Sequence, residues 1–524
     1  MNRHAEHWVW AASETTRELR DSFARRGLAR NVAAGISTAL VALPLNIALA
    51  LACDLPASVG LWTGALAGIV GAVLGGARLQ ITGPEVALAP MSYAIVSEHG
   101  LDGLLWCTLL AGLLQVVFGA ARLGRYVRAI PAPVILGFMI AVGLMVLDGQ
   151  LPRLLGMPDE TRSLFDAITL GRATLDPTPT LLGLAGCALV VGLPRLHPRI
   201  PAPLVAVAVV MFLVWALALR VPHVPDVDSV HPAFGLRALS TGELVALLPS
   251  ALGLALLASL DSLLSAVSLD ARMGTRHRSD QELVAQGVAN ALAGLCGGMP
   301  VAGAIVRSAA AADAGGDNRA APLVQSLVLG TLLLAMGHHL DAIPLTVLAG
   351  ILCVVGAKLV QPDRLLALFR RSRVDAVIAL VTTVSILAID FVAGVAVGVA
   401  VSLGRFALGQ ARLRVAVDRS RADARVAVVR VDGPLVFATV AGLEETLLGI
   451  EHPRLELDLA GVCSVDVTAV DGVRRAFAQL SERGVEVEVV NARPAVARQV
   501  SPRGGVEPAT ETDASARARE LARG

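Results

Sequence analysis

The feature that most limits how this chain can fold is a series of long apolar runs. The runs recur from residue 31 to residue 411, and each is about 20 residues long, enough to cross the roughly 30 Å hydrocarbon core of a bilayer as a helix. Only 17% of the 524 residues are charged, against about 25% in an average soluble protein. The sequence therefore predicts an all-α polytopic membrane protein with the lipid bilayer as its surroundings. The net charge of +1 excludes nucleic acid as a partner.

Charged or Pro/Gly-rich breaks divide the apolar runs into two sets of seven. An odd number of helices per repeat inverts the second copy in the membrane, so we expect about 14 transmembrane helices in a 7+7 inverted repeat, over residues 31–220 and 242–411. Residues 1–30 mix arginines with carboxylates and resemble a cytoplasmic segment, not a cleavable signal. The candidate spans are 31–51, 57–75, 84–97, 101–120, 130–148, 178–194 and 202–220, then 243–269, 281–296, 303–314, 320–337, 342–360, 374–390 and 391–411.

The distribution of arginines supports this topology. Cytoplasmic loops are expected to be the positive ones. With the N-terminus inside, fourteen crossings bring every strongly basic loop to the same side and predict cytoplasmic N- and C-termini. The arginines of these loops are Arg122, Arg125, Arg128, Arg195, Arg199, Arg272, Arg276, Arg278, Arg364, Arg370, Arg371 and Arg373.

Two spans are too short to cross the membrane, and they hold the third position of each repeat. Each follows a short extended segment rich in Pro and Gly, at residues 78–84 and 297–303. The inverted topology brings the two half-helices in from opposite sides, so their N-termini should face each other near mid-membrane. Unpaired N–H groups and positive dipole ends then converge on one point, which suits a small anion. The alternative is that Pro and Gly only kink two full-length helices.

Three polar residues fall near this point. Arg307 lies about one turn into the second half-helix, and an intramembrane charge costs about 2.5–3.5 kcal/mol, which marks it as functional. It either balances the charge of a bound anion or pairs with a carboxylate such as Asp261. Glu85 follows Pro84 at the start of the first half-helix, as a favourable N-terminal carboxylate or a second protonatable group. Asn46 follows a proline break in the first span and is a candidate hydrogen-bond donor.

Asp261 lies in the middle of an apolar span, with Ser265 one helical turn later. Desolvation of an unpaired carboxylate favours its protonated form, so Asp261 is a candidate proton carrier. Alternatively, Asp261 and Ser265 supply oxygen ligands to Na⁺, although a nearby Arg307 would repel that ion. A static ion pair with Arg307 is the third possibility.

After Phe406 the charge rises and the pattern changes to alternating strands and helices. Strands are expected at 425–431, 435–437, 454–459 and 485–490, and helices at 440–448 and 470–482, which predicts a small cytoplasmic α/β domain over 413–500. Thr468 at a helix start is a possible phosphosite or an exposed cap. Residues 501–524 are expected to be disordered.

The sequence contains no catalytic triad, P-loop, metal motif or CxxC pair, so we expect no enzyme activity, cofactor, metal site or disulfide.

Four segments together resemble the SulP family of inorganic anion transporters, and the C-terminal region resembles the STAS domain of that family. The segments are VALPLNIALAL, LQITGPEVALAP, LDSLLSAVSLDARMGTRHRSDQELVAQGVAN and GGMPVAGAIVRSAA. The resemblance implies core and gate domains, an elevator-type movement, homodimers and a bacterial inner-membrane location. It also implies a substrate site at Leu45, Asn46, Pro84, Glu85, Ala304 and Arg307, with coupling through Asp261 and Ser265.

The leading hypothesis is a proton-coupled secondary transporter of small oxyanions, with sulfate first, bicarbonate second and a small dicarboxylate third. A sodium-dependent bicarbonate or dicarboxylate transporter is the nearest alternative. A nucleobase permease shares the architecture but would not place Arg307 at its site. Two further hypotheses are a membrane-tethered signalling protein that acts through the STAS-like domain and a passive anion channel.

Overall fold

A computed structural model describes most of the chain and divides it into two compact units, residues 1–399 and 400–524. We call them the membrane unit and the C-terminal unit and describe each by itself. The described residues are 15–23, 27–124, 131–158, 161, 163–169, 175–197, 200–225, 236–389, 391–410, 413–418, 426–435, 437–450, 452–462, 464–465 and 467–500. The predicted tail at 501–524 lies outside them.

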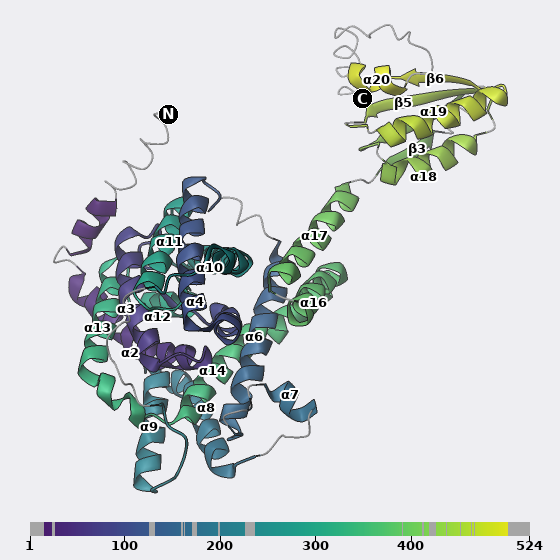
Figure 1. The fold of residues 1–524 in the computed structure, drawn as a ribbon. Helices are drawn as coiled ribbons and strands as arrows, with labels where there is room; N and C mark the ends of the chain where they lie inside the picture. The colour runs from purple at the N-terminus through teal and green to yellow at the C-terminus, as the bar shows by residue number, and fades with distance from the viewer. Residues whose placement is uncertain are drawn as a thin grey trace. The chain divides into compact units, whose positions relative to one another are not determined.

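Long apolar helices dominate the membrane unit (Figure 1). In the described part of the chain, seven helical segments have the length and apolarity needed to cross a membrane, and three shorter helices are similarly apolar. This confirms a multi-pass membrane protein. The seven are Leu28–Ala52, Ala57–Leu74, Val86–Ala120, Ala132–Leu154, Pro177–Leu196, Thr241–Met273 and Leu345–Arg371.

The helices follow the two predicted sets of seven. Gly100, with φ 69°, divides α4 (Ala89–Ala120) into two arms, which correspond to the expected spans 84–97 and 101–120. The first set also contains α2 (Leu28–Ala52), α3 (Ala57–Leu74), β1 (Thr82–Pro84), η1 (Val86–Leu88), α6 (Ala132–Leu154), α7 (Leu164–Thr169), α8 (Pro177–Leu196) and α9 (Ala202–Ala216). The second contains α10 (Thr241–Met273), α11 (Ser279–Leu295), β2 (Val301–Gly303), α12 (Ile305–Asp313), α13 (Ala320–Met336), η2 (Gly337–Ala342), α14 (Leu345–Val360), α15 (Pro362–Arg371), α16 (Arg373–Ala388) and α17 (Phe391–Gln410).

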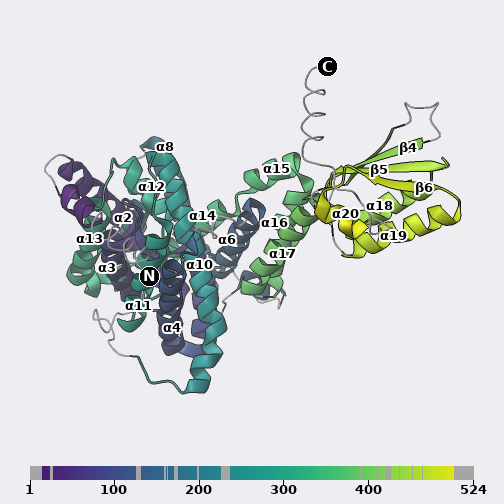
Figure 2. The ribbon, with the colours of Figure 1, turned by 90° about the horizontal axis from the view of Figure 1, so that it is seen from above.

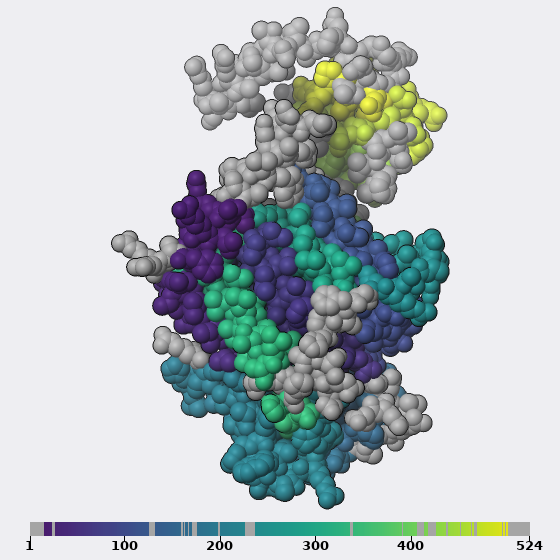
Figure 3. Space-filling model, turned by 60° about the vertical axis from the view of Figure 1, so that its left-hand side comes forward, coloured from purple at the N-terminus to yellow at the C-terminus, as the bar shows by residue number. Residues whose placement is uncertain are grey.

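Helices from both repeats pack into two groups. In the core group, α13 packs on α2 and α3, α11 packs on α3 and α4, and α10 packs on α4 and α12. In the gate group, α6 packs on α14 and α16, and α8 packs on α9 and α14. Both ribbon views place α6 and α16 on one side of α10 (Figures 1 and 2). Figure 3 shows α13, in green, beside the purple N-terminal helices.

The close approach of α4 and α11 depends on a pair of glycines. A Cβ atom added at Gly287 would lie 2.6 Å from the carbonyl oxygen of Gly112, which is closer than any real side chain allows. Glycine therefore lets the two backbones touch, as small residues do where membrane helices pack. This contact fixes α11 of the second repeat against α4 of the first.

The two predicted extended segments pair with each other at the centre of the core group. β1 and β2 form an antiparallel ladder in which Thr82 faces Gly303 and Pro84 faces Val301. All six residues of the two strands are buried. The half-helices η1–α4 and α12 begin directly after these strands, so the strand pair positions both helix starts.

The C-terminal unit is the predicted small α/β domain. Its sheet has the order β3-β4-β5-β6, with β3 antiparallel to β4 and the other pairs parallel. Both ribbon views show α18 and α19 on one face of this sheet (Figures 1 and 2). The elements are β3 (Arg414–Asp418), β4 (Val426–Asp432), α18 (Phe437–Leu448), β5 (Arg454–Gly461), α19 (Val467–Glu482), β6 (Glu486–Val490) and α20 (Pro494–Val500).

Two details of this unit differ from the sequence-based expectation. The strand expected at 435–437 is wrong at its end, because α18 already begins at Phe437. Leu435 makes a β-bridge with Val465, and Val436 lies outside the described residues. β3, a short five-residue strand next to charged sequence, was not expected from the sequence. Such short apolar stretches carry too little periodicity to separate strand from helix.

Candidate functional site

The candidate site lies where the paired strands β1 and β2 end and the helices η1 and α12 begin. Ile305, the first residue of α12, and Val86, the first residue of η1, are each separated from the preceding strand by one residue. Neither Ala304 nor Glu85, the residues that precede these helices, makes a side-chain capping hydrogen bond. The first N–H groups of the two helices therefore provide positive potential at the site from both repeats.

Buried amides and hydroxyls hold the strand pair in place. Asn290 on α11 donates to the carbonyl oxygen of Val301 at 3.0 Å and accepts from its N–H at 2.8 Å. Ser262 on α10 accepts from the N–H of Gly303 at 2.9 Å, and Ser308 on α12 accepts from that of Ile81 at 2.9 Å. These bonds replace the sheet partners that a two-stranded ladder lacks, so the strands are rigid supports.

Replacing Asn290 with alanine is expected to destabilise this support. The substitution leaves both backbone groups of buried Val301 without their partner, at a cost of about 1–3 kcal/mol for each group. We expect a clearly lower thermal unfolding temperature in detergent, measured by size-exclusion chromatography after heating. Thr331→Ala, which removes an exposed hydroxyl that bonds to its own helix, is the matched control. An Asn290→Ala protein that unfolds at the wild-type temperature would contradict this role.

Arg307 is the central charge of the site. Its side chain is 1% exposed and lies on the third residue of α12. One Nη donates to Asn46 Oδ1 at 2.9 Å, and the other donates to Glu85 Oε2 at 3.0 Å and to the carbonyl oxygen of Pro84. Gly83 makes room for this arrangement, because a Cβ atom there would lie 2.9 Å from Arg307 Nη1. The guanidinium thus joins residues of α2, β1 and α12.

The carboxylate that pairs with Arg307 is Glu85. Asp261 was one expected ion-pair partner of Arg307, but the structure gives Arg307 no hydrogen bond to it. Glu85 was expected to be a favourable carboxylate at its helix start or a second protonatable group. It precedes η1 with φ −126° and ψ 144°, the usual backbone of a residue at a helix N-cap, and its carboxylate accepts a hydrogen bond from Arg307. Its side chain is 13% exposed against 1% for Arg307, so the carboxylate is the more accessible member of the pair.

Asp261 and Ser265 lie on one face of α10, next to this pair. Both are buried, at 3% and 1% exposure, and Asp261 is within electrostatic reach of Glu85 and Arg307. Neither Asp261 Oδ2 nor Ser265 Oγ has a hydrogen-bond partner among the described residues, and the same holds for two donors, Asn46 Nδ2 and Arg307 Nε. Buried polar atoms without partners are rare in proteins. Four such atoms lie together here, so we take this place as the candidate ligand site.

The remaining predicted site residues fall at the same place or outside the described side chains. Leu45, Pro84 and Ala304 are buried beside Asn46, Glu85 and the start of α12. Thr468 is the second residue of α19, and its side chain lies outside the described part of the structure. No group of three or more His, Cys, Asp or Glu residues in the described part is arranged to hold a metal ion.

The residues that support the site were not predicted from the sequence. Asn290, Ser262 and Ser308 occur in helices whose periodicity only indicates burial. One signal was present, because polar side chains in membrane helices face the bundle interior and find partners there. The partners themselves are 11 to 227 residues away in sequence, and no local pattern identifies them.

Two family models match the chain, and together they account for most of its length. The model of the "Sulfate permease family" matches residues 28–382. The model of the "STAS domain" matches residues 419–505. The first match covers the strand pair, both half-helices and every candidate site residue of the membrane unit.

Individual relatives and solved structures agree with these matches. The putative sulfate transporter YvdB of Bacillus subtilis is 30% identical over 442 residues, which are 81% of this chain and 83% of the relative. The bicarbonate transporter BicA of Synechocystis is 26% identical over 89% of both chains. The solved transmembrane domain of a cyanobacterial BicA superposes with a TM-score of 0.64 at 28% identity, over 73% of this chain and 99% of that one. Murine Solute Carrier 26 family member A9 shares the fold, with a TM-score of 0.79 at 20% identity, over 97% and 92% of the chains.

Proposed function

Because the chain belongs to the sulfate permease family, we propose that it is a secondary active transporter that binds a small oxyanion at Arg307, between the two half-helix starts. This proposal depends on one observation, the set of hydrogen-bond donors around Arg307. Arg307 Nε and Asn46 Nδ2 are buried without partners in the described part, and Arg307, near the start of α12, reaches Pro84 and Glu85 at the start of the other half-helix. An oxyanion satisfies all of these groups together.

Glu85 makes the binding of an anion depend on protonation. When Glu85 is ionised, it neutralises Arg307 and repels a bound anion. A proton on Glu85 or on neighbouring Asp261 removes a negative charge from a buried site, where electrostatic interactions are strong. Proton and anion therefore favour each other's binding, which is the thermodynamic requirement for symport. We assign the main coupling role to Asp261, whose Oδ2 has no hydrogen-bond partner among the described residues.

Sodium is the alternative coupling ion. Asp261 Oδ2 and Ser265 Oγ, one helical turn apart and both without described partners, are the oxygen ligands that Na⁺ would use. Arg307 and Glu85 form a neutral pair, which weakens the repulsion expected from Arg307 alone. The proton is still favoured, because two oxygens are few for a metal ion.

The preferred substrate is sulfate, followed by bicarbonate and a small dicarboxylate. Relatives carry the names of sulfate and of bicarbonate transporters, and the helix dipoles favour negative charge without selecting one anion. A nucleobase permease of similar architecture is disfavoured by the buried cation at the site. The match to the model of the sulfate permease family also favours an oxyanion over a nucleobase as the substrate.

The two helix groups support an elevator-type movement. The core group contains the paired strands β1 and β2, both half-helices and Asp261. It would carry the anion past the gate group. We place the transport domain at residues 31–411 and the STAS domain at 413–500. Homodimers, an inner-membrane location and cytoplasmic termini complete the proposal.

A competition experiment tests the substrate assignment. Labelled sulfate uptake is measured in proteoliposomes with excess unlabelled sulfate, bicarbonate, oxalate or succinate. We expect unlabelled sulfate to inhibit most strongly, with bicarbonate second, because the site offers several donors and one guanidinium to a compact oxyanion. Stronger inhibition by succinate than by sulfate would reassign the substrate to a dicarboxylate.

A further inference from the structure

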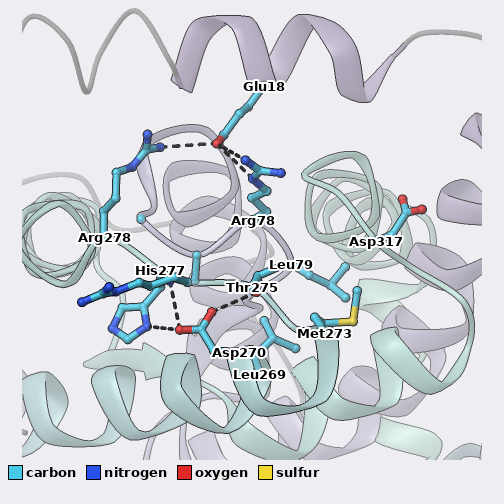
Figure 4. A pocket seen from close by; sticks show the side chains of 13 residues that line it. Glu18, Arg78, Leu79, Leu269, Asp270, Met273, Thr275, His277, Arg278 and Asp317 are labelled. Carbon is cyan, nitrogen blue, oxygen red and sulfur yellow. Dashed lines mark hydrogen bonds and ion pairs between the residues drawn. The ribbon is translucent and has the colours of Figure 1, made fainter.

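A second cluster of charges lies apart from Arg307 and Asp261, at the ends of α3, α10 and α12. Figure 4 shows its centre, where Glu18 of the helix over residues 15–22 faces Arg78 and Arg278. Arg78 follows α3, Arg278 precedes α11, and a third arginine, Arg319, precedes α13. The three guanidinium groups thus come from three different loops of the core group.

All three arginines bind the single carboxylate of Glu18. Arg319 donates from Nε at 3.0 Å and from Nη2 at 2.8 Å to Glu18 Oε2. Arg78 donates from Nε to Oε1 at 2.9 Å, and Arg278 donates from Nη2 to Oε2 at 3.4 Å. Two-point binding of a carboxylate by a guanidinium is the geometry that arginine also uses for phosphate and sulfate oxygens.

Arg319 shows that this cluster is built into the fold. Its side chain is fully buried, and its remaining donors bind the carbonyl oxygens of Ala72 at 3.1 Å and Gly75 at 2.7 Å. Among the described residues, Glu18 is the only carboxylate that hydrogen-bonds to it. A buried guanidinium without an anionic partner is costly, so this position requires an anion whenever Glu18 leaves.

The neighbouring carboxylates are already engaged. Glu282 accepts from the N–H groups of Gly76 and Ala77 at 2.7 and 3.0 Å. Asp270 accepts from Thr275 and from His277, and Asp317 pairs with Arg30. These bonds hold the loops in shape, and the structure gives none of the three acids a hydrogen bond to the three arginines.

A cavity of about 280 Å³ adjoins the cluster. Its charged lining consists of Arg78, Arg276 and Arg278 together with Glu18, Asp270 and Asp317. Three guanidinium groups therefore border a space large enough for an inorganic anion. The residues around Arg307, Asp261 and Asn46 do not line it. The cavity is therefore separate from the proposed transport site.

The helix over residues 15–22 is held mainly by polar contacts. Apart from Thr15 and Ser22, which are buried, its residues are half-buried or exposed. Thr15 accepts hydrogen bonds from Arg278 at 2.9 Å and Gln281 at 2.8 Å. Burial opposes ionisation of Glu18, but the hydrogen bond and charge of Arg319 and the charges of Arg278 and Arg78 lower its pKa overall. The ionic contact is thus present at neutral pH and is lost only as pH falls through that lowered pKa.

We propose that the three arginines form a second anion site, which Glu18 fills in the structure and which inorganic phosphate or a similar divalent oxyanion fills when the helix over residues 15–22 detaches. Phosphate offers four oxygens to the donors of the three guanidinium groups, whereas the carboxylate of Glu18 offers two. Arg78 is separated from β1 by only three residues, so exchange of the ligand is transmitted to the strand that supports Arg307.

Phosphate binding to the Glu18→Gln protein tests the proposal directly. Phosphate is titrated calorimetrically into full-length protein in detergent free of phospholipid, so that free anion is the only source of phosphate. We expect Glu18→Gln to bind at least about tenfold more tightly than wild type, because it removes a competing charge-assisted ligand. Asp21→Asn, which removes an exposed carboxylate of the same helix, should bind like wild type.

Second substitutions in the Glu18→Gln protein locate the site. Arg78→Gln, at a partly exposed arginine, should weaken phosphate binding, whereas Arg364→Gln, at an exposed arginine of α15, should leave it unchanged. Equal phosphate binding by wild type and Glu18→Gln would overturn the proposal. Equal weakening by Arg364→Gln would do the same, because the loss would then not depend on the cluster.

If Glu18→Gln does not fold, cleavage of the wild-type protein by trypsin tests the same proposal. Trypsin cleaves after Arg17 and Arg20, which lie on the helix over residues 15–22, faster when that helix is detached. We expect phosphate to accelerate this cleavage relative to chloride at equal ionic strength. Equal cleavage rates in the two salts would overturn the anion site.

Discussion

Replacing Arg307 with alanine is expected to reduce sulfate uptake in proteoliposomes by about ten- to a hundredfold, since a hydrogen bond to a charged group contributes about 1.5–3 kcal/mol. The side chain binds Asn46, Pro84 and Glu85 at once, so its loss removes the positive charge and leaves Glu85 to repel the substrate. The helix N-termini remain, so residual uptake at high sulfate concentration is expected. Initial uptake rates over a range of sulfate concentrations measure the effect.

Two further variants separate charge from geometry. Arg307→Lys keeps the charge but cannot reach Asn46 and Glu85 together, so intermediate uptake is expected. Adding Glu85→Gln to Arg307→Ala removes the unpaired carboxylate and should recover part of the lost uptake. Size-exclusion profiles show whether each variant is folded. Wild-type uptake by a folded Arg307→Ala protein would exclude Arg307 from anion binding.

Replacing Asp261 with asparagine is expected to abolish the stimulation of uptake by an inward proton gradient. Asparagine keeps the shape of the side chain but cannot gain or lose a proton, and Asp261 is buried with an oxygen that has no described partner. The variant should still exchange sulfate across the membrane, because Arg307 and the helix starts are unchanged. Sulfate uptake is compared with and without the gradient in both proteins.

Ser265→Ala distinguishes the two coupling ions. If a proton couples transport, this variant should keep the response to the gradient, since the serine hydroxyl does not titrate. If Na⁺ is bound by Asp261 and Ser265, both variants should lose sodium-dependent uptake instead. Normal stimulation of Asp261→Asn by the proton gradient would remove Asp261 from the coupling role.

Much of the fold was predictable because membrane helices are encoded locally. Length and apolarity alone locate the spans, and the matching interruptions at 78–84 and 297–303 predicted the two half-helices. The structure confirms these features, and it pairs the interruptions as β1 and β2. That pairing joins residues more than 200 positions apart, and no local signal encodes its register.

The candidate residues could be named from the sequence, but their contacts with one another could not. Burying a charge in a membrane is costly, which is why Arg307 and Asp261 stand out in the sequence, and their roles stay predictions. The sequence does not show that Glu85 is the partner of Arg307, because that depends on the turn after Pro84. Glu18 was missed for a similar reason, since an acidic residue in a charged N-terminal segment resembles any solvated one.

The measurement that tests the central claim most directly is labelled sulfate uptake into proteoliposomes with and without an imposed inward proton gradient. The account predicts concentrative uptake that requires the gradient and that falls strongly in the Arg307→Ala protein. Sulfate uptake no greater than that of protein-free liposomes, with or without the gradient, would contradict it.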